Sequence, residues 1–144
     1  MIRTFHPSDL TEITKIWLKA NLEAHNFIPA NYWENCLEQV KELLPAAELY
    51  LYEDSPAVPL GFIGMTGDYI AGIFVKKSAR SKGIGKQLLD HVKALRHDLT
   101  LHVYQKNERA VRFYLREGFC IQSRTEDDNT GETEYLMTWR KTYD

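Results

Sequence analysis

The sequence has few cysteines, no long apolar run and no excess of charge of either sign, and each deficit excludes a class of protein. Two cysteines in 144 residues, Cys36 and Cys120, form neither a disulfide framework nor a zinc-binding pattern. We expect both to be small buried hydrophobic residues in a reducing compartment. The N-terminus has no apolar signal segment, and no apolar run approaches the length of a membrane span. The sequence therefore predicts a cytoplasmic protein with no metal site and no membrane partner.

The charge balance argues against a nucleic-acid partner. Lys and Arg number 18 and Asp and Glu number 20, which gives a net charge of −2. General binding to nucleic acid depends on a strongly basic face, which this composition does not favour. The length suits one domain, and the chain has no repeat or linker. We therefore expect a single domain over residues 1–144, as a monomer or a homodimer.

Hydrophobic periodicity predicts an α/β (α+β) fold with the order β-α-α-β-β-β-α-β-α-β-β. The strand at 69–75, the helix at 83–95 and the strand at 99–104 form one βαβ unit, so we expect the two strands to be parallel neighbours. Tight turns make the earlier strands antiparallel, which gives a mixed sheet with helices on its faces. The remaining strands are predicted at 2–5, 48–53, 60–67, 119–126 and 133–140, and the remaining helices at 8–24, 29–44 and 107–118.

A basic, glycine-rich corner, "ARSKGIGK" at 79–86, lies between that strand and that helix. A helix N-terminus offers unpaired N–H groups, and glycines let a phosphate approach the backbone. The corner lacks the Ser or Thr that follows the lysine of a P-loop, and Leu88 occupies the third small position of a dinucleotide fingerprint. Two interpretations remain: a cradle for another phosphate compound, or a tight junction with solvated cations.

A second stretch, "NERAVRFYLREGF" at 107–119, favours the cradle. Together the two stretches resemble the GCN5-related N-acetyltransferase (GNAT) family. Its coenzyme A motif, Arg/Gln-x-x-Gly-x-Gly/Ala, matches residues 80–85. Its Asn-x-x-Ala-x-x-Phe-Tyr-x-x-x-Gly-Phe segment matches residues 107–119. The runs "HNFI", "ANYW" and "VYQKN" further resemble a small bacterial branch of the family, some of whose members acetylate protein lysines.

The resemblance implies a fold whose two parallel strands splay apart, with acetyl-CoA held in the gap as co-substrate. The pantetheine arm would form hydrogen bonds with the first splayed strand, and the pyrophosphate would accept hydrogen bonds from the backbone amides around Lys82–Lys86. The splay would also free an N–H to polarise the thioester carbonyl. The cofactor-binding residues implied are Ile73, Phe74, Val75, Arg80, Ser81, Lys82, Gly83, Ile84, Gly85, Lys86, Asn107, Ala110 and Phe113.

The resemblance also implies a proton donor, Tyr114, for the departing thiolate. On packing grounds alone, Tyr114 is one more inward aromatic beside Phe113, and Asn107 is a simple helix N-cap. Many peptide-acetylating relatives carry a glutamate five residues before the motif asparagine, where this chain has His102. His102 is the candidate base, since histidine exchanges protons near neutral pH. A strand histidine with no catalytic role, His25 as base, and deprotonation by bulk solvent are the alternatives.

The acceptor amine stays open between a protein lysine, an N-terminal amine, a polyamine and an antibiotic amine. Candidate aromatics for its pocket are Phe27, Tyr32, Trp33, Tyr69 and Tyr104, and residues 125–134 form an acidic hairpin that would attract a cation.

A second function class is a non-catalytic acetyl-CoA sensor or partner-binding module. A third is a nucleotide-binding module that uses the same corner.

Overall fold

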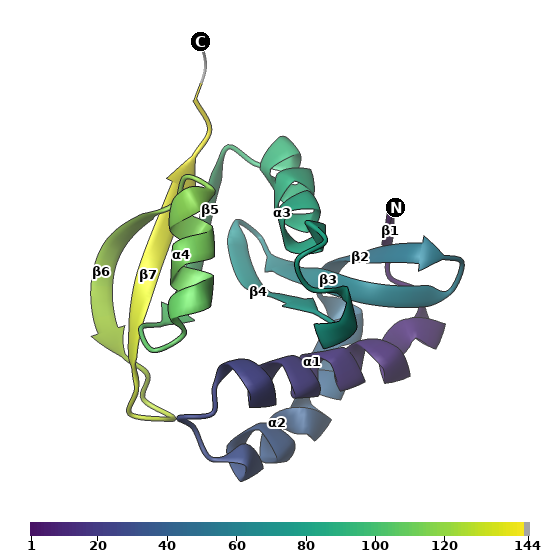
Figure 1. The fold of residues 1–144 in the computed structure, drawn as a ribbon, viewed down its shortest axis with the longest axis horizontal. Helices are drawn as coiled ribbons and strands as arrows, with labels where there is room; N and C mark the ends of the chain where they lie inside the picture. Colours follow the sequence, from purple (N-terminus) through teal and green to yellow (C-terminus); the bar gives the residue numbers. More distant parts are fainter. Residues whose placement is uncertain (143–144) are drawn as a thin grey trace.

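The computed structural model describes residues 1–142 and, within this range, contains a seven-stranded mixed sheet with helices on both faces (Figure 1). The last two residues of the expected domain lie outside the described range. The elements follow the predicted order, so the α/β assignment is confirmed. They are β1 (Ile2–Thr4), α1 (Leu10–Ala24), α2 (Ala30–Leu43), β2 (Glu48–Ser55), β3 (Val58–Thr66), β4 (Tyr69–Val75), α3 (Ile84–Leu95), β5 (Asp98–Tyr104), α4 (Glu108–Arg116), β6 (Cys120–Glu126) and β7 (Thr133–Arg140).

The strand order is β1-β2-β3-β4-β5-β7-β6. Strands β4 and β5 are parallel neighbours, as the βαβ unit predicted, and the other pairs are antiparallel. Strand β7 lies between β5 and β6, so the closing hairpin joins the sheet through its second strand. This places one side of β7 next to β5 along its whole length.

Strands β4 and β5 splay apart after two register pairs. Tyr69 faces Thr100 and Ile70 faces Leu101, and no further pair follows. On the other side of β4, Met65 pairs with Ile70 and Gly64 with Gly72, so Ala71 is an extra residue in the strand. Such a bulge bends a strand and increases its twist. Residues 71–75 consequently turn away from β5, and Figure 1 shows the β1–β4 and β5–β7 parts of the sheet diverging.

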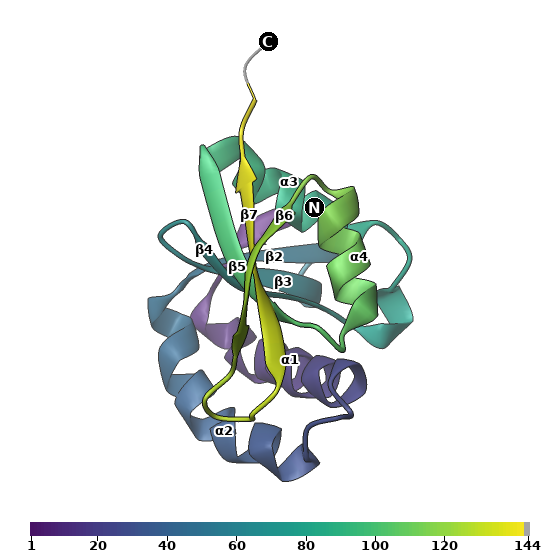
Figure 2. The same ribbon diagram turned by 90° about the vertical axis from the view of Figure 1, so that its left-hand side faces the viewer.

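The helices bury two apolar clusters on opposite faces of the sheet (Figures 1 and 2). Helices α3 and α4 cover the larger cluster, which includes Leu88, Leu101 and Met137. Helix α1 covers the smaller one through Ile13 and Ile16. The splayed ends of β4 and β5 therefore lie between packed helices. None of the helices in residues 1–142 has both the length and the apolar character that crossing a membrane demands.

The two cysteines are free, but one is not buried. Cys36 is half-buried on α2, whereas Cys120 is exposed at the start of β6. The expectation of two buried cysteines is wrong for Cys120, because β6 is an edge strand that pairs only with β7 and is exposed along its whole length. The thiol therefore faces solvent.

Candidate functional site

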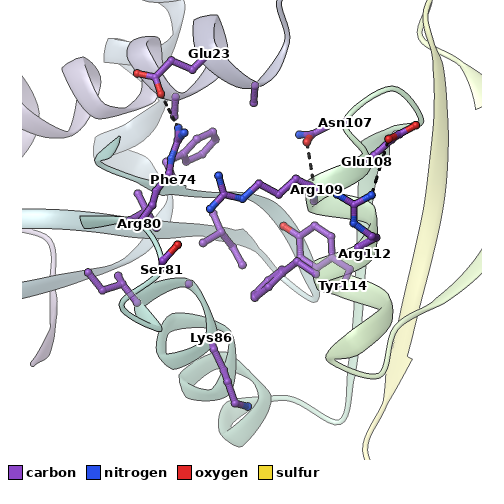
Figure 3. A pocket seen from close by; sticks show the side chains of 18 of the residues that line it. Glu23, Phe74, Arg80, Ser81, Lys86, Asn107, Glu108, Arg109, Arg112 and Tyr114 are labelled. Atoms are coloured by element: carbon purple, nitrogen blue, oxygen red, sulfur yellow. Dashed lines mark hydrogen bonds and ion pairs between the residues drawn. The ribbon is translucent and has the colours of Figure 1, made fainter. Parts of the chain in front are cut away.

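A large cleft opens where β4 leaves β5. Its volume is about 970 Å³, and it is lined by the end of α1, the second half of β4, the loop before α3, and α4. Every residue predicted to hold the donor lines this cleft except Lys82, whose exposed side chain lies outside it. Figure 3 shows side chains from β4, the loop and α4 around one space. Segments far apart in the sequence thus converge here. We call this space the larger cleft.

The loop before α3 has two residues with left-handed backbone. Ser81 has φ +67° and Gly83, the N-cap of α3, has φ +76°. Only glycine adopts the second conformation without strain, and a Cβ built on Gly83 would meet nothing within 4 Å. The loop therefore presents the first N–H groups of α3 to the cleft without a side chain over them. That arrangement favours binding of an anion.

Two cations of the glycine-rich corner already have acidic partners. The Arg80 guanidinium lies 2.8 Å from the Glu23 carboxylate of α1. The ammonium of Lys86 lies 3.1 Å from Asp90 and 3.0 Å from Glu117 (Figure 3 shows Lys86 on α3). These ion pairs partly neutralise both cations, so an anion bound in the cleft needs further positive charge.

Further cations come from α4, and the motif comparison missed them. Arg112 and Arg116 also have acidic partners, Glu108 and Glu117, each at 3.9 Å. Figure 3 shows Arg109 extending across the cleft toward Arg80, and no described residue forms an ion pair with it. Arg109, Arg112 and Arg116 recur at the i, i+3 and i+7 spacing of one helix face, which is the signal that would have found them. The cleft's cations outnumber its carboxylates: Arg80, Lys86, Lys106, Arg109, Arg112 and Arg116 against Glu23, Glu108 and Glu117.

Tyr114 lies at the inner end of the cleft. It is 8% exposed and packs edge-on against Phe113 and Phe119. Figure 3 shows its ring among the cleft-lining side chains, and no described residue forms a hydrogen bond with its hydroxyl. Burial raises the pKa of Tyr114, and the nearby Tyr69 raises it further. The phenol therefore holds its proton throughout the neutral range.

A chain of hydrogen bonds joins α1 to α4 along the wall of the cleft. Asn107 caps α4, because its side-chain oxygen accepts from the Ala110 N–H at 3.3 Å. Its amide Nδ2 lies 3.1 Å from His25 Nε2, and His25 Nδ1 lies 3.1 Å from the Asn21 side-chain oxygen. Burial lowers the pKa of His25 to about 4. His25 is thus a neutral ring that donates to Asn21 and accepts from Asn107.

A second, smaller pocket of about 270 Å³ meets the cleft. Asn21, His25, Ile73, Phe74, Asn107, Ala110 and Tyr114 line both. Of the predicted acceptor aromatics, Trp33, Tyr69 and Tyr104 line this smaller pocket, whereas Phe27 and Tyr32 do not. His102 also lines it, and its Nδ1 lies 2.9 Å from the Tyr69 hydroxyl. Two further residues line it: Trp17, which sequence reasoning did not identify, and Glu134, which belongs to the predicted acidic hairpin at 125–134.

Comparisons with known proteins agree with this geometry. A family model described as "Acetyltransferase (GNAT) domain" matches residues 45–121, which include both motifs. The chain is 37% identical to the peptidyl-lysine N-acetyltransferase YiaC of Escherichia coli over 96% of each chain. It is 30% identical to the peptidyl-lysine N-acetyltransferase YjaB of the same organism, over 94% of this chain and 92% of that protein. The solution structure of apo YjaB superposes with a TM-score of 0.87, at 27% identity over 96% of each chain.

Proposed function

The chain belongs to the GNAT family of acetyltransferases and transfers an acetyl group to an amine, and on that premise we propose acetyl-CoA as the donor and the side chain of a protein lysine as the acceptor. The observation that carries the proposal is the meeting of two unlike cavities at Tyr114, one large and cationic, the other small and aromatic. No feature of the described residues favours a sensor without turnover.

The larger cleft suits the donor in shape and charge. Residues 71–75 of β4 have no β5 partner, so their free backbone edge is open to an extended amide-bearing arm. The bare N-terminus of α3 and the excess of arginines suit a pyrophosphate and a further phosphate. When bound, acetyl-CoA supplies the acetyl group as a thioester. The chain's own role is to hold that group at the inner end of the cleft, beside Tyr114.

Tyr114 is proposed to give its phenolic proton to the departing thiolate. The residue lines both cavities, so its hydroxyl is near the place where donor and acceptor meet. Burial raises the pKa of Tyr114, which makes it a weaker acid. The same dry surroundings also raise the pKa of a thiol. The pKa values of proton donor and acceptor therefore shift in the same direction, and the proton transfer is not made much less favourable.

His102 is proposed to accept the proton of the incoming ammonium. When Nδ1 carries the ring proton and donates it to the Tyr69 hydroxyl, Nε2 keeps a free lone pair. His25 is less suited, because both of its nitrogens have partners and its pKa is lowered to about 4. We assign His25 a positioning role through Asn107.

The size of the smaller pocket favours an unbranched amine such as lysine over an antibiotic. Its volume of about 270 Å³ lies below the roughly 300–1,000 Å³ of sites for drug-sized ligands. One unbranched side chain fits such a volume better than an antibiotic does. Relatives that match nearly the whole chain are named peptidyl-lysine N-acetyltransferases. Both observations favour a side-chain amine presented by a protein.

The proposal is tested with purified protein, acetyl-CoA and three acceptors. These are a lysine peptide with a blocked N-terminus, a peptide whose only amine is its N-terminus, and spermidine. Release of free thiol gives the rate, and mass spectrometry locates the acetyl group. We expect turnover with the lysine peptide and acetylation at its ε-nitrogen. Preference for either other acceptor would overturn the assignment of lysine, and absence of turnover with all three would overturn the proposed function.

A further inference from the structure

The smaller pocket contains one carboxylate and no cation among its described lining residues. That carboxylate belongs to Glu134, at the start of β7. It is half-buried, and no described residue forms an ion pair or hydrogen bond with it. The other acidic residues near it, Asp127 and Asp128, belong to the hairpin loop, and Asp127 accepts a hydrogen bond from Tyr104. A half-buried carboxylate without an ion-pair partner is available to bind a cation.

The position of Glu134 brings it to the candidate base. Glu134 pairs directly with Tyr104 in the β5–β7 register, so their side chains share a face of the sheet. His102 is two residues before Tyr104 and lies on the same face. A cation held by Glu134 would therefore lie close to the imidazole of His102.

The walls of the pocket suit a cation as well. Trp17, Trp33, Tyr69 and Tyr104 line it, and aromatic faces attract ammonium groups. The pocket thus lacks a cation, and the ε-ammonium group of a lysine supplies one.

We propose that Glu134 binds the ε-ammonium group of the acceptor lysine and so selects cationic side chains for the smaller pocket. This inference rests on the proposed function. Bound there, the ammonium transfers one proton to His102 Nε2, and the free amine attacks the thioester carbonyl. The new C–N bond replaces the C–S bond, and the sulfur takes the proton of Tyr114. The second proton of the attacking nitrogen returns to the Tyr114 phenolate, and His102 releases its proton to solvent. Glu134 takes up no proton during the reaction. Its negative charge stabilises the ammonium group when the lysine binds and the His102 imidazolium after the proton transfer.

The test is steady-state kinetics of Glu134→Gln with a lysine peptide at saturating acetyl-CoA. Loss of one charge-assisted hydrogen bond predicts that KM for the peptide rises about tenfold. KM for acetyl-CoA should stay within about twofold, because Glu134 does not line the larger cleft. Glu126→Gln is the matched control: it removes the same charge from the same hairpin, from an exposed residue outside both cavities.

A second measurement separates recognition of charge from loss of structure. Peptides with trimethyl-lysine or norleucine at the acceptor position cannot be acetylated there, and only the first carries the positive charge. We expect trimethyl-lysine to compete better than norleucine against wild type, and this preference to shrink in Glu134→Gln. If wild type acetylates lysine but Glu134→Gln behaves like Glu126→Gln, the inference is overturned and the proposed function stands. If wild type acetylates no lysine, both fail.

Discussion

Replacement of His25 by glutamine should make the fold less sensitive to acid. His25 lies between two asparagines, with its ring stacked on Trp33 and edge-on to Tyr104. Protonation of the ring would put a donor where Asn107 already donates and would bury a charge without a counter-ion. Glutamine keeps one donor and one acceptor but has no titratable group. The substitution therefore removes the titration of residue 25 while keeping most of its hydrogen bonds.

The size of the effect follows from the pKa of His25. Burial lowers it from the ordinary 6.5 to about 4, so the unfolded chain binds this proton at higher pH than the folded chain. The contribution of His25 to stability is complete above pH 6.5 and is lost as the pH falls toward 4. Between about pH 7.5 and about pH 5, the free energy of unfolding should fall by about 2 kcal/mol through this group alone.

The assay is urea unfolding of wild type and His25→Gln at those two pH values. Other shifted groups titrate in both proteins and cancel in the comparison. Glu134, whose pKa is raised by burial, acts with the opposite sign, since its protonation favours the folded form. Wild type should lose about 2 kcal/mol more than the variant on acidification. Equal losses would mean that folded His25 takes up the proton as easily as the unfolded chain, and would refute its assignment as a neutral link between helices.

Four further predictions concern turnover and binding. Tyr114→Phe should lower kcat about 100-fold with KM for acetyl-CoA nearly unchanged, measured by thiol release; equal losses in both would indicate a packing role. Gly83→Val should weaken coenzyme A binding at least tenfold in calorimetry, because φ +76° strains valine and its side chain would cover the loop amides; an unchanged titration would contradict the cradle. Arg109→Ala should weaken the same binding about tenfold, whereas Arg140→Ala, which removes a distant exposed arginine, should not. His102→Gln should lower kcat about tenfold or more, and an unchanged kcat would exclude His102 as the base.

The fold was largely predictable because its signals are local. The alternation of apolar residues in β2, the apolar runs of β3 and β4, and the helical stripe of α3 each indicate an element without reference to the rest of the chain. The order of those elements then determines which strands are parallel. The exposure of Cys120 was missed because it depends on which strand ends up at the edge of the sheet. The placement of β7 between β5 and β6 was missed for the same reason.

The site was predictable only where a motif marks it. Backbone contacts to a phosphate need particular residues in a fixed order, so Gly83 and Gly85 can be recognised in one sequence. Trp17 and the link from Asn21 through His25 to Asn107 depend on side chains from distant segments. No spacing rule connects α1 to α4, because their relative position is set by the packing of the whole sheet. Arg109 and Arg112 are an intermediate case for prediction. Their spacing in the sequence shows that they share one face of a helix, but it does not show which part of the structure that face lies against.

One inserted residue explains why both cavities occur where they do. The bulge at Ala71 comes immediately after the last pair between β4 and β5, and side-chain direction alternates along a strand. With continuous pairing, β5 would cover the free edge of residues 71–75, and the larger cleft would lose its β4 wall. The same pairing would close the space beside Tyr69 and His102, since the smaller pocket shares Ile73 and Phe74 with the cleft. The two cavities therefore lie on two sides of one irregularity in the sheet, and Tyr114 from α4 lines both.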